Sequence, residues 1–434
     1  MIFSDLVGII ADDLTGANDT ALQFHQKGAN TKILLDSECS PKIKAGTEVW
    51  ALSSESRNVP AEVAISRVEK AVNTFVENFN FDYYYKKIDS TLRGHIGLET
   101  LTMLNILEYD AAIIMPAFPQ EGRITVGGYH LAKGVPIGRT EMAIDPHAPI
   151  TESHVPTLLR SQLGEHSADI VGVIDLHTVM NGAGPILIKI NDLIAEGKRL
   201  IVADATSITD LEQIALAINK CDKKLLPTGT AAGAQVLSKY WLAGIEKEGV
   251  NISLDKKPKL IVSGTATQIT ANQIKKLEQA DDYENINFIA LNANEILNNV
   301  DDNLVERIVT NLTSGVTVCV HTSDLVANFD GFSDDSFNAE LTKEKFASAI
   351  TDFLAVLTKK VLEKIEVILI TLGGETSYKC CKSISSNELQ LVDEVAPAIS
   401  LCYDINHKWI ITKSGNLGNS NTLIEILRYL EHHE

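Results

Sequence analysis

The sequence predicts an α/β protein with two domains, each built on a mainly parallel β-sheet flanked by helices, and an active site in the cleft between them. Three observations lead to this fold class. The length of 434 residues suggests two or three domains at about 150 residues each. Short apolar runs repeatedly lead into a polar turn and then into a segment with helical periodicity, as in parallel sheets covered on both faces. A polar stretch at residues 249–259 separates two series of these units, so we expect domains at 1–250 and 257–434.

The first series predicts the elements of the N-terminal domain. Each strand is a run of apolar or β-branched residues, and each helix follows a cluster of Asp, Ser, Thr or Gly. The expected strands cover residues 6–11, 49–52, 83–88, 111–115, 170–174 and 200–203, and the expected helices cover 18–27, 61–79 and a segment ending near 108.

Residues 116–156 interrupt this alternation because they are rich in proline and glycine and show no clear periodicity. A connection of this length inside a compact domain is usually functional or disordered. The stretch also carries Arg123 and His130, which a simple linker would not need. We therefore expect an ordered excursion close to a site, although a lone histidine is more often structural.

The second series predicts three strand–turn–helix units in the C-terminal domain. The strands are expected at residues 260–263, 367–372 and 409–413, and helices are expected to begin near Thr270 and Thr422. Residues 328–340 have the composition of an acidic surface loop.

The composition excludes some classes of function. With 38 Lys and Arg against 57 Asp and Glu, the formal net charge is −19, which argues against broad contact with nucleic acid. It still allows a locally positive pocket for a small anion. The six cysteines show no zinc-site spacing, and the sequence shows neither a signal peptide nor an apolar run long enough to span a membrane. We expect a cytoplasmic protein without a membrane partner.

Two adjacent carboxylates, Asp12 and Asp13, end the first predicted strand at the entry to a helix. One carboxylate there can cap the helix, but capping does not explain the second. Paired carboxylates can hold Mg²⁺, accept a proton from a hydroxyl group, or do both. The turn therefore predicts a catalytic role for Asp12 or Asp13, and the sequence does not decide between them.

A second charged turn, at residues 86–94, combines cations, an acid and hydroxyl groups. Arg93 could bind a carboxylate with two hydrogen bonds, and Lys87 could supply a point charge. Asp89 could bind sugar hydroxyls or orient Lys87, and Arg57, which also follows a strand, could join them. The alternative is that these residues form an exposed charged loop and no binding site.

The turns of the C-terminal half contain Gly, Ser and Thr in place of charges. Glycine turns let the backbone N–H groups approach a phosphate, and a helix N-terminus adds positive potential. Ser263, Thr265 and Thr376 could add hydroxyl donors and Lys413 a positive charge. Each turn alone could simply end a strand, but three in one domain favour a nucleotide phosphate chain. No Walker-type phosphate loop is present.

The chain resembles the four-carbon acid sugar kinases in seven blocks that occur in the family's order and span nearly the whole sequence. The blocks around Asp12 and Asp89 are the most specific of them. They are IADDLTGANDTALQF (10–24), YKKIDSTLRGHIGLE (85–99), PAFPQEGRITVGGYHLAKGVPIGRTEMAIDP (116–146), TGTAAG (228–233), VSGTATQITANQ (262–273), TLGGETS (371–377) and KSGNLG (413–418).

This resemblance implies an N-terminal domain that binds a sugar acid and a C-terminal domain that binds ATP. It implies Mg²⁺ as a cofactor and transfer of phosphate to the terminal 4-hydroxyl of D-threonate, with D-erythronate or an oxo-tetronate as alternatives. Asp12 and Asp13 would be catalytic. The substrate residues would be Thr15, Gly16, Arg57, Lys87, Asp89, Ser90, Arg93, Gly94 and Arg123, and the nucleotide residues would be Ser263, Gly264, Thr265, Gly373, Gly374, Glu375, Thr376, Lys413 and Gly415.

One block departs from the family pattern. The last motif is commonly K-x-G-G-F-G, whereas this chain has Asn416 and Leu417 in place of the second glycine and the aromatic residue. Two other classes of function stay open at this stage: another ATP-using enzyme, such as a small-acid ligase, and a non-enzymatic protein that senses an anionic metabolite. The metal ligands and the oligomeric state, a homo-oligomer included, also stay open.

Overall fold

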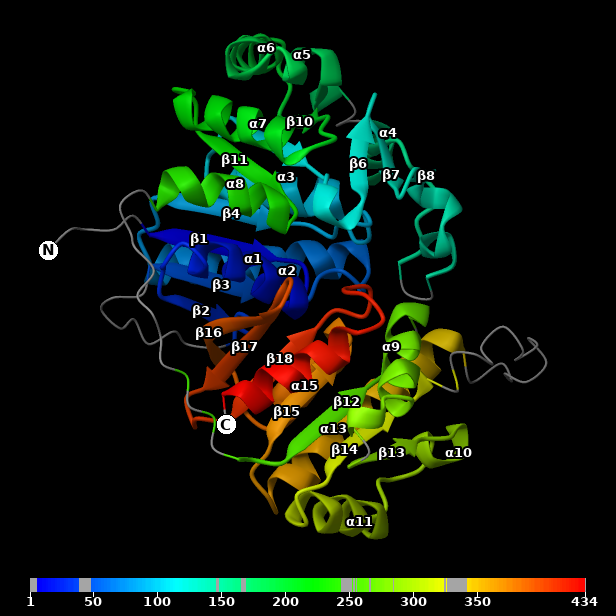
Figure 1. Ribbon diagram of the computed structural model, residues 1–434. Coiled ribbons are helices and arrows are strands. Elements are labelled where there is room, and N and C mark those ends of the chain that lie inside the picture. The colour runs from blue at the N-terminus through cyan, green and yellow to red at the C-terminus, as the bar shows by residue number, and fades with distance from the viewer. Residues whose placement is uncertain are drawn as a thin grey trace, which may run out of the picture. The chain divides into compact units, whose positions relative to one another are not determined.

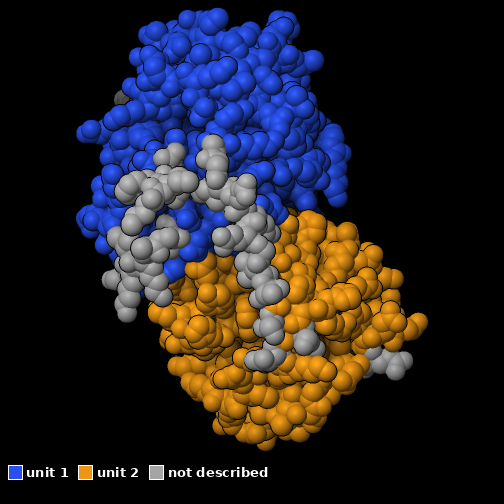
Figure 2. All heavy atoms as spheres, turned by 60° about the vertical axis from the view of Figure 1, so that its left-hand side comes forward, with its two compact units in different colours: residues 1–247 blue, residues 248–434 orange. Residues whose placement is uncertain are grey.

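The structure is a computed structural model that describes most of the chain as two compact units, residues 1–247 and 248–434 (Figure 2). The described residues are 6–38, 48–145, 148–164, 169–242, 252, 254, 256–264, 267–283, 285–323, 325 and 342–433. The two units are described separately below.

Unit 1 contains an eight-stranded sheet with the order β2-β3-β1-β4-β11-β5-β10-β9, in which every pairing is parallel (Figure 1). The chain changes its direction of travel across the sheet between β1 and β4, and parallel sheets bind their ligands beyond the carboxyl ends of strands at such a point. The strands are β1 (Val7–Ala11), β2 (Thr31–Leu34), β3 (Val49–Ser53), β4 (Tyr83–Lys87), β5 (Ala111–Met115), β9 (Val171–Ile174), β10 (Leu200–Ala203) and β11 (Leu225–Gly229).

Helices cover both faces of this sheet, as its strands, which are almost wholly buried, require. One layer consists of α1, α8, α7 and α6, which pack side by side, and the other consists of α2, α3 and α4. The helices are α1 (Leu14–His25), α2 (Ala61–Asn78), α3 (Ile96–Ile106), α4 (Val155–Leu163), α5 (Leu176–Met180), α6 (Ala183–Ala195), α7 (Ile208–Lys220) and α8 (Ala231–Trp241).

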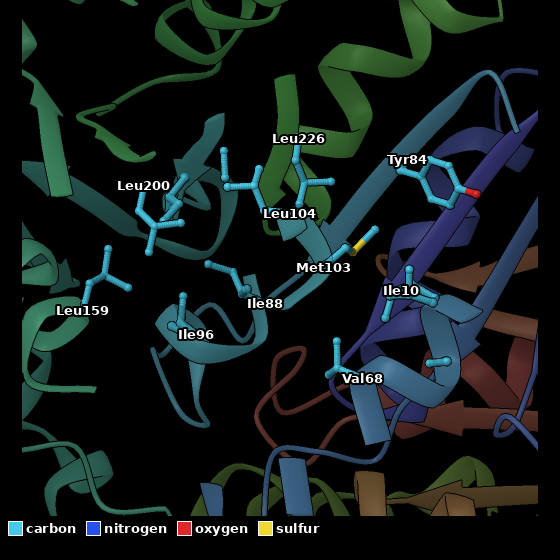
Figure 3. Packing of buried hydrophobic residues seen from close by; sticks show 14 of the residues in the cluster. Ile10, Val68, Tyr84, Ile88, Ile96, Met103, Leu104, Leu159, Leu200 and Leu226 are labelled. Atoms are coloured by element: carbon cyan, nitrogen blue, oxygen red, sulfur yellow. The ribbon is translucent and has the colours of Figure 1, made fainter. Parts of the chain in front are cut away.

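An apolar core of unit 1 fills the space between the sheet and the layer of α2, α3 and α4. Ile10 of the sheet, Val68 of α2 and Met103 of α3 belong to one buried cluster, which extends to Leu159 of α4 (Figure 3). Burying an aliphatic side chain of this size stabilises the fold by about 1.5–3 kcal/mol. The core therefore holds the strand ends, and the turns that follow them, in fixed positions.

The excursion after β5 forms a small antiparallel sheet, β6-β7-β8, that includes a β-hairpin. Glycines with positive φ, Gly127 at 58° and Gly128 at 75°, turn the chain between β6 and β7. The prediction of an ordered but irregular excursion missed this hairpin because the alternation lasts only four residues in each strand. The strands are β6 (Arg123–Val126), β7 (Tyr129–Ala132) and β8 (Val135–Pro136).

Unit 2 contains a second sheet with the order β13-β14-β12-β15-β18-β17-β16. Its first five strands pair in parallel, and β17 pairs antiparallel with both β16 and β18. The strands are β12 (Lys259–Ser263), β13 (Ile286–Ala290), β14 (Thr317–His321), β15 (Ile368–Leu372), β16 (Glu388–Ala396), β17 (Ile399–Asp404) and β18 (Trp409–Lys413).

The helices of unit 2 also form two layers, with α11, α13 and α14 in one and α9 and α15 in the other. Leu277, Ile370 and Ile426 belong to its apolar core. The helices are α9 (Gln268–Glu278), α10 (Ala293–Ile296), α11 (Asp302–Thr313), α13 (Lys343–Leu362), α14 (Gly374–Ser383) and α15 (Thr422–His432).

The structure confirms the predicted fold class, a two-domain α/β protein with mainly parallel sheets. The first helix begins at Leu14 rather than at residue 18 because the Asp13 carboxylate accepts a hydrogen bond from the N–H of Gly16 and caps it. Within the described part of the chain, no helix has the length and apolar character needed to cross a membrane. The predicted acidic loop at 328–340 lies outside the described residues.

Candidate active site

The turns after β1 and β3 meet because these strands are neighbours in the parallel sheet. Arg57, from the turn after β3, binds both aspartates of the turn after β1 with four hydrogen bonds. Its Nε and Nη2 donate to Asp12 at 2.8 and 3.0 Å, and its Nη1 and Nη2 donate to Asp13, both at 2.7 Å. All three side chains are buried.

The two aspartates differ in how many of their hydrogen-bond acceptor positions are still open. A carboxylate has about four acceptor positions. Asp13 fills four of them, because it also accepts from the N–H of Gly16 and from Oγ1 of Thr15, each at 2.8 Å. Asp12 accepts only the two bonds from Arg57, so within the described structure its oxygens keep capacity for further donors. Burial alone would raise the pKa of Asp12, but Arg57 and Lys87 outweigh it and hold that pKa below its ordinary value.

The turn after β4 contains a second set of ion pairs. Arg93 donates from Nε to Asp89 at 2.8 Å and from Nη1 to Asp145 at 3.1 Å. Arg57 also lies 3.9 Å from Asp89, so the two turns form one charged cluster. Burial on its own would raise the pKa of Asp89, but Arg93 and Arg57 hold it well below its usual range, and Thr91 adds a hydrogen bond to the charged form.

Lys87 is the last residue of β4, and its side chain is buried beside the first turn of α1. A Cβ atom at Gly16 would lie only 2.8 Å from its Nζ and 2.6 Å from Oδ1 of Asp13, so only glycine allows this approach. Among the described residues, the Lys87 ammonium makes no hydrogen bond or ion pair. It is therefore a buried cation that can still take an anionic partner.

Arg123 at the start of β6 is a second cation that has no carboxylate partner in the described part of the chain. Its Nη1 donates to the Ser90 hydroxyl at 2.6 Å. His130 of β7 binds the same turn, with Nε2 2.9 Å from the Ser90 carbonyl oxygen, while its Nδ1 lies 3.0 Å from Thr125 Oγ1. Burial lowers the pKa of His130 to about 4, so it is neutral at pH 7 and holds the hairpin onto the turn.

Asp204, directly after β10, anchors the tip of the same hairpin. Its carboxylate accepts from the N–H groups of Gly127 at 2.7 Å, Gly128 at 2.9 Å and Leu176 at 3.1 Å. The hairpin is thus fixed at its tip by Asp204 and along its strands by His130 and Arg123.

Glu55 stabilises the turn that contains Asp12 and Asp13. It has a positive φ of 49° and is half-buried, and its Oε1 accepts from the N–H of Leu14 at 2.9 Å and from the Ser53 hydroxyl at 2.6 Å. Burial raises the pKa of Glu55 to about 8, against these two hydrogen bonds. Glu55 therefore satisfies a free N–H at the start of α1, next to Asp13.

In unit 2, the three glycine turns also come together. A Cβ atom at Gly264 would lie 2.7 Å from Oγ1 of Thr376, so the turns after β12 and β15 are in contact. The N–H of Gly373 donates to the Lys413 carbonyl oxygen at 2.8 Å, which joins the turns after β15 and β18. The Gly415 carbonyl oxygen accepts from Oγ1 of Thr267 and of Thr270 at the start of α9, at 2.7 and 2.9 Å.

The remaining residues predicted in unit 2 lie at these same turns. Ser263 is buried at the end of β12, and Gly374 begins α14. Glu375 is bound to α13 and to its own helix, through Thr351 Oγ1 at 3.2 Å and Lys379 Nζ at 3.1 Å. Thr265 lies outside the described residues.

Lys413 is the only lysine among the predicted nucleotide residues, and it is fully buried. Its Nζ donates to Thr270 Oγ1 at 3.2 Å and to the Ser414 carbonyl oxygen at 2.8 Å. Burial lowers its pKa to about 7, because no carboxylate in the described structure compensates its charge.

A resident metal site is not found among the described residues, since no three His, Cys, Asp or Glu side chains lie together in a way that could hold an ion. Mg²⁺ often binds proteins through one or two carboxylates plus the phosphates of a substrate.

Comparison with known proteins agrees with the separation of charged turns in unit 1 from glycine turns in unit 2. Residues 7–237 match a family model described as a sugar-binding N-terminal domain, and residues 260–423 match one described as a nucleotide-binding C-terminal domain. A D-erythronate kinase from Heliobacterium modesticaldum is 31% identical over 98% of this chain and 97% of its own. The chain belongs to the four-carbon acid sugar kinase family.

Further relatives support a sugar-acid kinase without fixing its substrate. A D-threonate kinase from Salmonella typhimurium is 28% identical over 98% of both chains, and a 3-oxo-tetronate kinase from Haemophilus influenzae is 26% identical over 96% of this chain and 98% of its own. A solved structure described as a putative tRNA synthase from Salmonella typhimurium has a TM-score of 0.78 at 22% identity and covers 97% of this chain and 98% of its own. That likeness shows the fold.

Sequence reasoning missed three residues of this kinase that hold the N-terminal cluster together, Glu55, Asp145 and Asp204. Asp204 and Glu55 both follow predicted strands, so the rule that selected Asp12 and Asp89 would also have selected them. Asp145 gave no such signal, because it lies at the end of the irregular excursion and reaches Arg93 only through the fold.

Proposed function

We propose that this kinase transfers the terminal phosphoryl group of ATP to the 4-hydroxyl of a four-carbon sugar acid, with D-threonate as the first candidate. Unit 1 would bind the sugar acid and unit 2 the nucleotide. The observation that carries the proposal is the charged cluster at the ends of β1, β3 and β4. There Lys87 and Arg123, two cations that bind no carboxylate among the described residues, accompany Asp12, an ionised aspartate with open acceptor positions.

The carboxylate of the sugar acid would bind to Lys87 and Arg123. Arg57 and Arg93, which the sequence also suggested for this task, already bind aspartates through several hydrogen bonds. Releasing either arginine would leave buried carboxylates unpaired, which costs several kcal/mol, on the order of 3–5. Lys87 and Arg123 can accept an anion without that penalty.

The proton of the attacking hydroxyl would go to Asp12. Asp13 is more exposed, with 10% of its side chain accessible against 3% for Asp12, but its acceptor positions are filled. A low pKa makes Asp12 a weak base. Phosphoryl transfer tolerates this because its transition state is loose and depends mainly on positioning and charge stabilisation.

The nucleotide phosphates would lie against the glycine turns of unit 2, with Lys413 and the N-termini of α9 and α14 supplying positive potential. Mg²⁺ would arrive bound to ATP. The acid and the nucleotide must meet for transfer, so an active site between the two domains stays a prediction.

Three four-carbon sugar acids are candidates for the substrate. D-threonate is favoured because the Asn18-Asp19-Thr20 continuation of the first block resembles the family members that act on D-threonate. D-erythronate is the specific alternative, because the D-erythronate kinase is 31% identical and the D-threonate kinase 28%. A 3-oxo-tetronate is a further alternative.

A coupled assay of ADP release with Mg-ATP tests this choice. The substrates are D-threonate, L-threonate, D-erythronate, L-erythronate and a 3-oxo-tetronate, with a non-sugar acid as control. We expect the highest kcat/KM for D-threonate. A higher value for another tetronate would change the substrate, whereas turnover only with the non-sugar acid would contradict the proposed class.

A further inference from the structure

Asn416 is a buried polar side chain that the described structure leaves without a hydrogen bond. It is 8% exposed, it lies in the turn after β18, and its Oδ1 has no partner. A buried polar atom that loses its hydrogen bonds to water costs about 1–3 kcal/mol when nothing replaces them. Such an atom at a strand end indicates that something outside the described chain completes it.

The backbone around Asn416 is held firmly, so its side chain is not free to turn away by a movement of the loop. On one side, the Gly415 carbonyl oxygen is bound by Thr267 and Thr270. On the other side, the Gln273 Nε2 donates to the carbonyl oxygens of Leu417 and Asn419, at 3.0 and 2.8 Å. These hydrogen bonds fix the backbone on both sides of Asn416 before any ligand arrives.

The missing partner of Oδ1 must be a hydrogen-bond donor because an amide oxygen only accepts. The ionised oxygens of a phosphate chain are acceptors, so they cannot be the partner of Oδ1, although Nδ2 of the same amide can donate to them. Donors on a nucleotide are found in its nucleoside part, as ribose hydroxyls or an exocyclic amino group of the base.

We propose that Asn416 determines nucleotide specificity, its Oδ1 accepting a hydrogen bond from a donor of the nucleoside, either a ribose hydroxyl or the exocyclic amino group. This inference rests on the proposed function, because it assumes that the turns of unit 2 bind the nucleotide. It gives a role to the position at which this chain departs from the glycine common in the family motif.

The test compares full-length wild type with Asn416→Ala by calorimetric titration, using ADP, 2′-deoxy-ADP, 3′-deoxy-ADP and the diphosphate of purine riboside, which lacks the 6-amino group. We expect Asn416→Ala to bind ADP about tenfold more weakly, as loss of one buried hydrogen bond implies. Wild type should bind one analogue about tenfold more weakly than ADP, and Asn416→Ala should not discriminate against that analogue. Asn406→Ala, at an exposed turn of the same unit, should bind ADP as wild type does.

Equal affinity of wild type for all four nucleotides would overturn the inference, and this result does not depend on the folding of any variant. An unchanged ADP affinity in Asn416→Ala would also overturn it. Failure of wild type to bind ADP at all would instead contradict the proposed function.

Discussion

At the scale of single residues, two adjacent aspartates that bind the same arginine differ in their open hydrogen-bond acceptor positions. Arg57 binds both carboxylates, but Thr15 and Gly16 complete the acceptor positions of Asp13 alone. Asp13 thus acts as a helix cap and a fixed counter-ion, while Asp12 is left with capacity for a substrate hydroxyl.

Substituting each aspartate by asparagine tests this division. Asp12→Asn should lower kcat by about 10²–10⁴, the range for loss of a general base, and should lower the melting temperature because its amide N–H₂ would face Arg57. Asp13→Asn should lower the melting temperature more, because it also weakens the bonds from Thr15 and Gly16 that begin α1, and should lower kcat less. Steady-state kinetics and thermal unfolding of both variants measure these effects. A larger kcat loss in Asp13→Asn would assign the base to Asp13.

Lys413 is a second residue whose chemistry can be tested. We predict that it takes up a proton when a nucleotide binds. Its pKa of about 7 in the free protein leaves it mostly neutral at pH 8, and a bound phosphate would raise that pKa. Binding at pH 8 should therefore take up close to one proton, affinity should fall as pH rises above about 7, and uptake should vanish near pH 6.

Titration of ADP at pH 8 in buffers of different ionisation enthalpy measures this uptake. The ADP phosphates are already ionised at that pH, so the proton must go to the protein. Lys413→Met should abolish the uptake. Equal uptake in Lys413→Met and wild type would show that another group titrates.

At the scale of elements, the β6–β7 hairpin places Arg123 on the turn after β4, where it donates to the Ser90 hydroxyl. Asp204 accepts three backbone N–H groups, two of them at the hairpin tip, and so connects the end of β10 to the position of Arg123. Asp204 is in this sense a positioning residue rather than a catalytic one.

Asp204→Asn should raise KM for the sugar acid by about tenfold, since an amide cannot accept all three bonds and an unpaired buried N–H costs about 1–3 kcal/mol. The affinity for ADP should not change. Asp175→Asn, at an exposed helix cap beside it, is the matched control and should leave KM unchanged. A lower melting temperature with an unchanged KM would reduce Asp204 to a structural role.

The elements also show what the sequence can predict. Strand ends such as Ala11 and Lys413 were predicted to within one residue, because apolar runs stop where polar turns begin. The sequence did not reveal the antiparallel pairing of β16 and β17, whose alternation is broken by irregularities in register. It could not show that Arg57 binds aspartates, since that depends on β1 and β3 being neighbours.

At the scale of the whole molecule, the net charge of −19 coexists with a function whose ligands are all anions. In unit 1, the four carboxylates Asp12, Asp13, Asp89 and Asp145 balance the four cations Arg57, Arg93, Lys87 and Arg123 in charge. The carboxylates bind Arg57 and Arg93, so the described structure leaves the positive charge of Lys87 and Arg123 for an anion.

The position of the transferred phosphate tests the central claim most directly. Wild-type protein is incubated with Mg-ATP and the preferred tetronate, and the product is examined by phosphorus–proton correlation NMR. The account predicts a phosphate monoester whose phosphorus couples to the two protons on C4. Coupling to a single proton on C2 or C3, or release of inorganic phosphate alone, would contradict it.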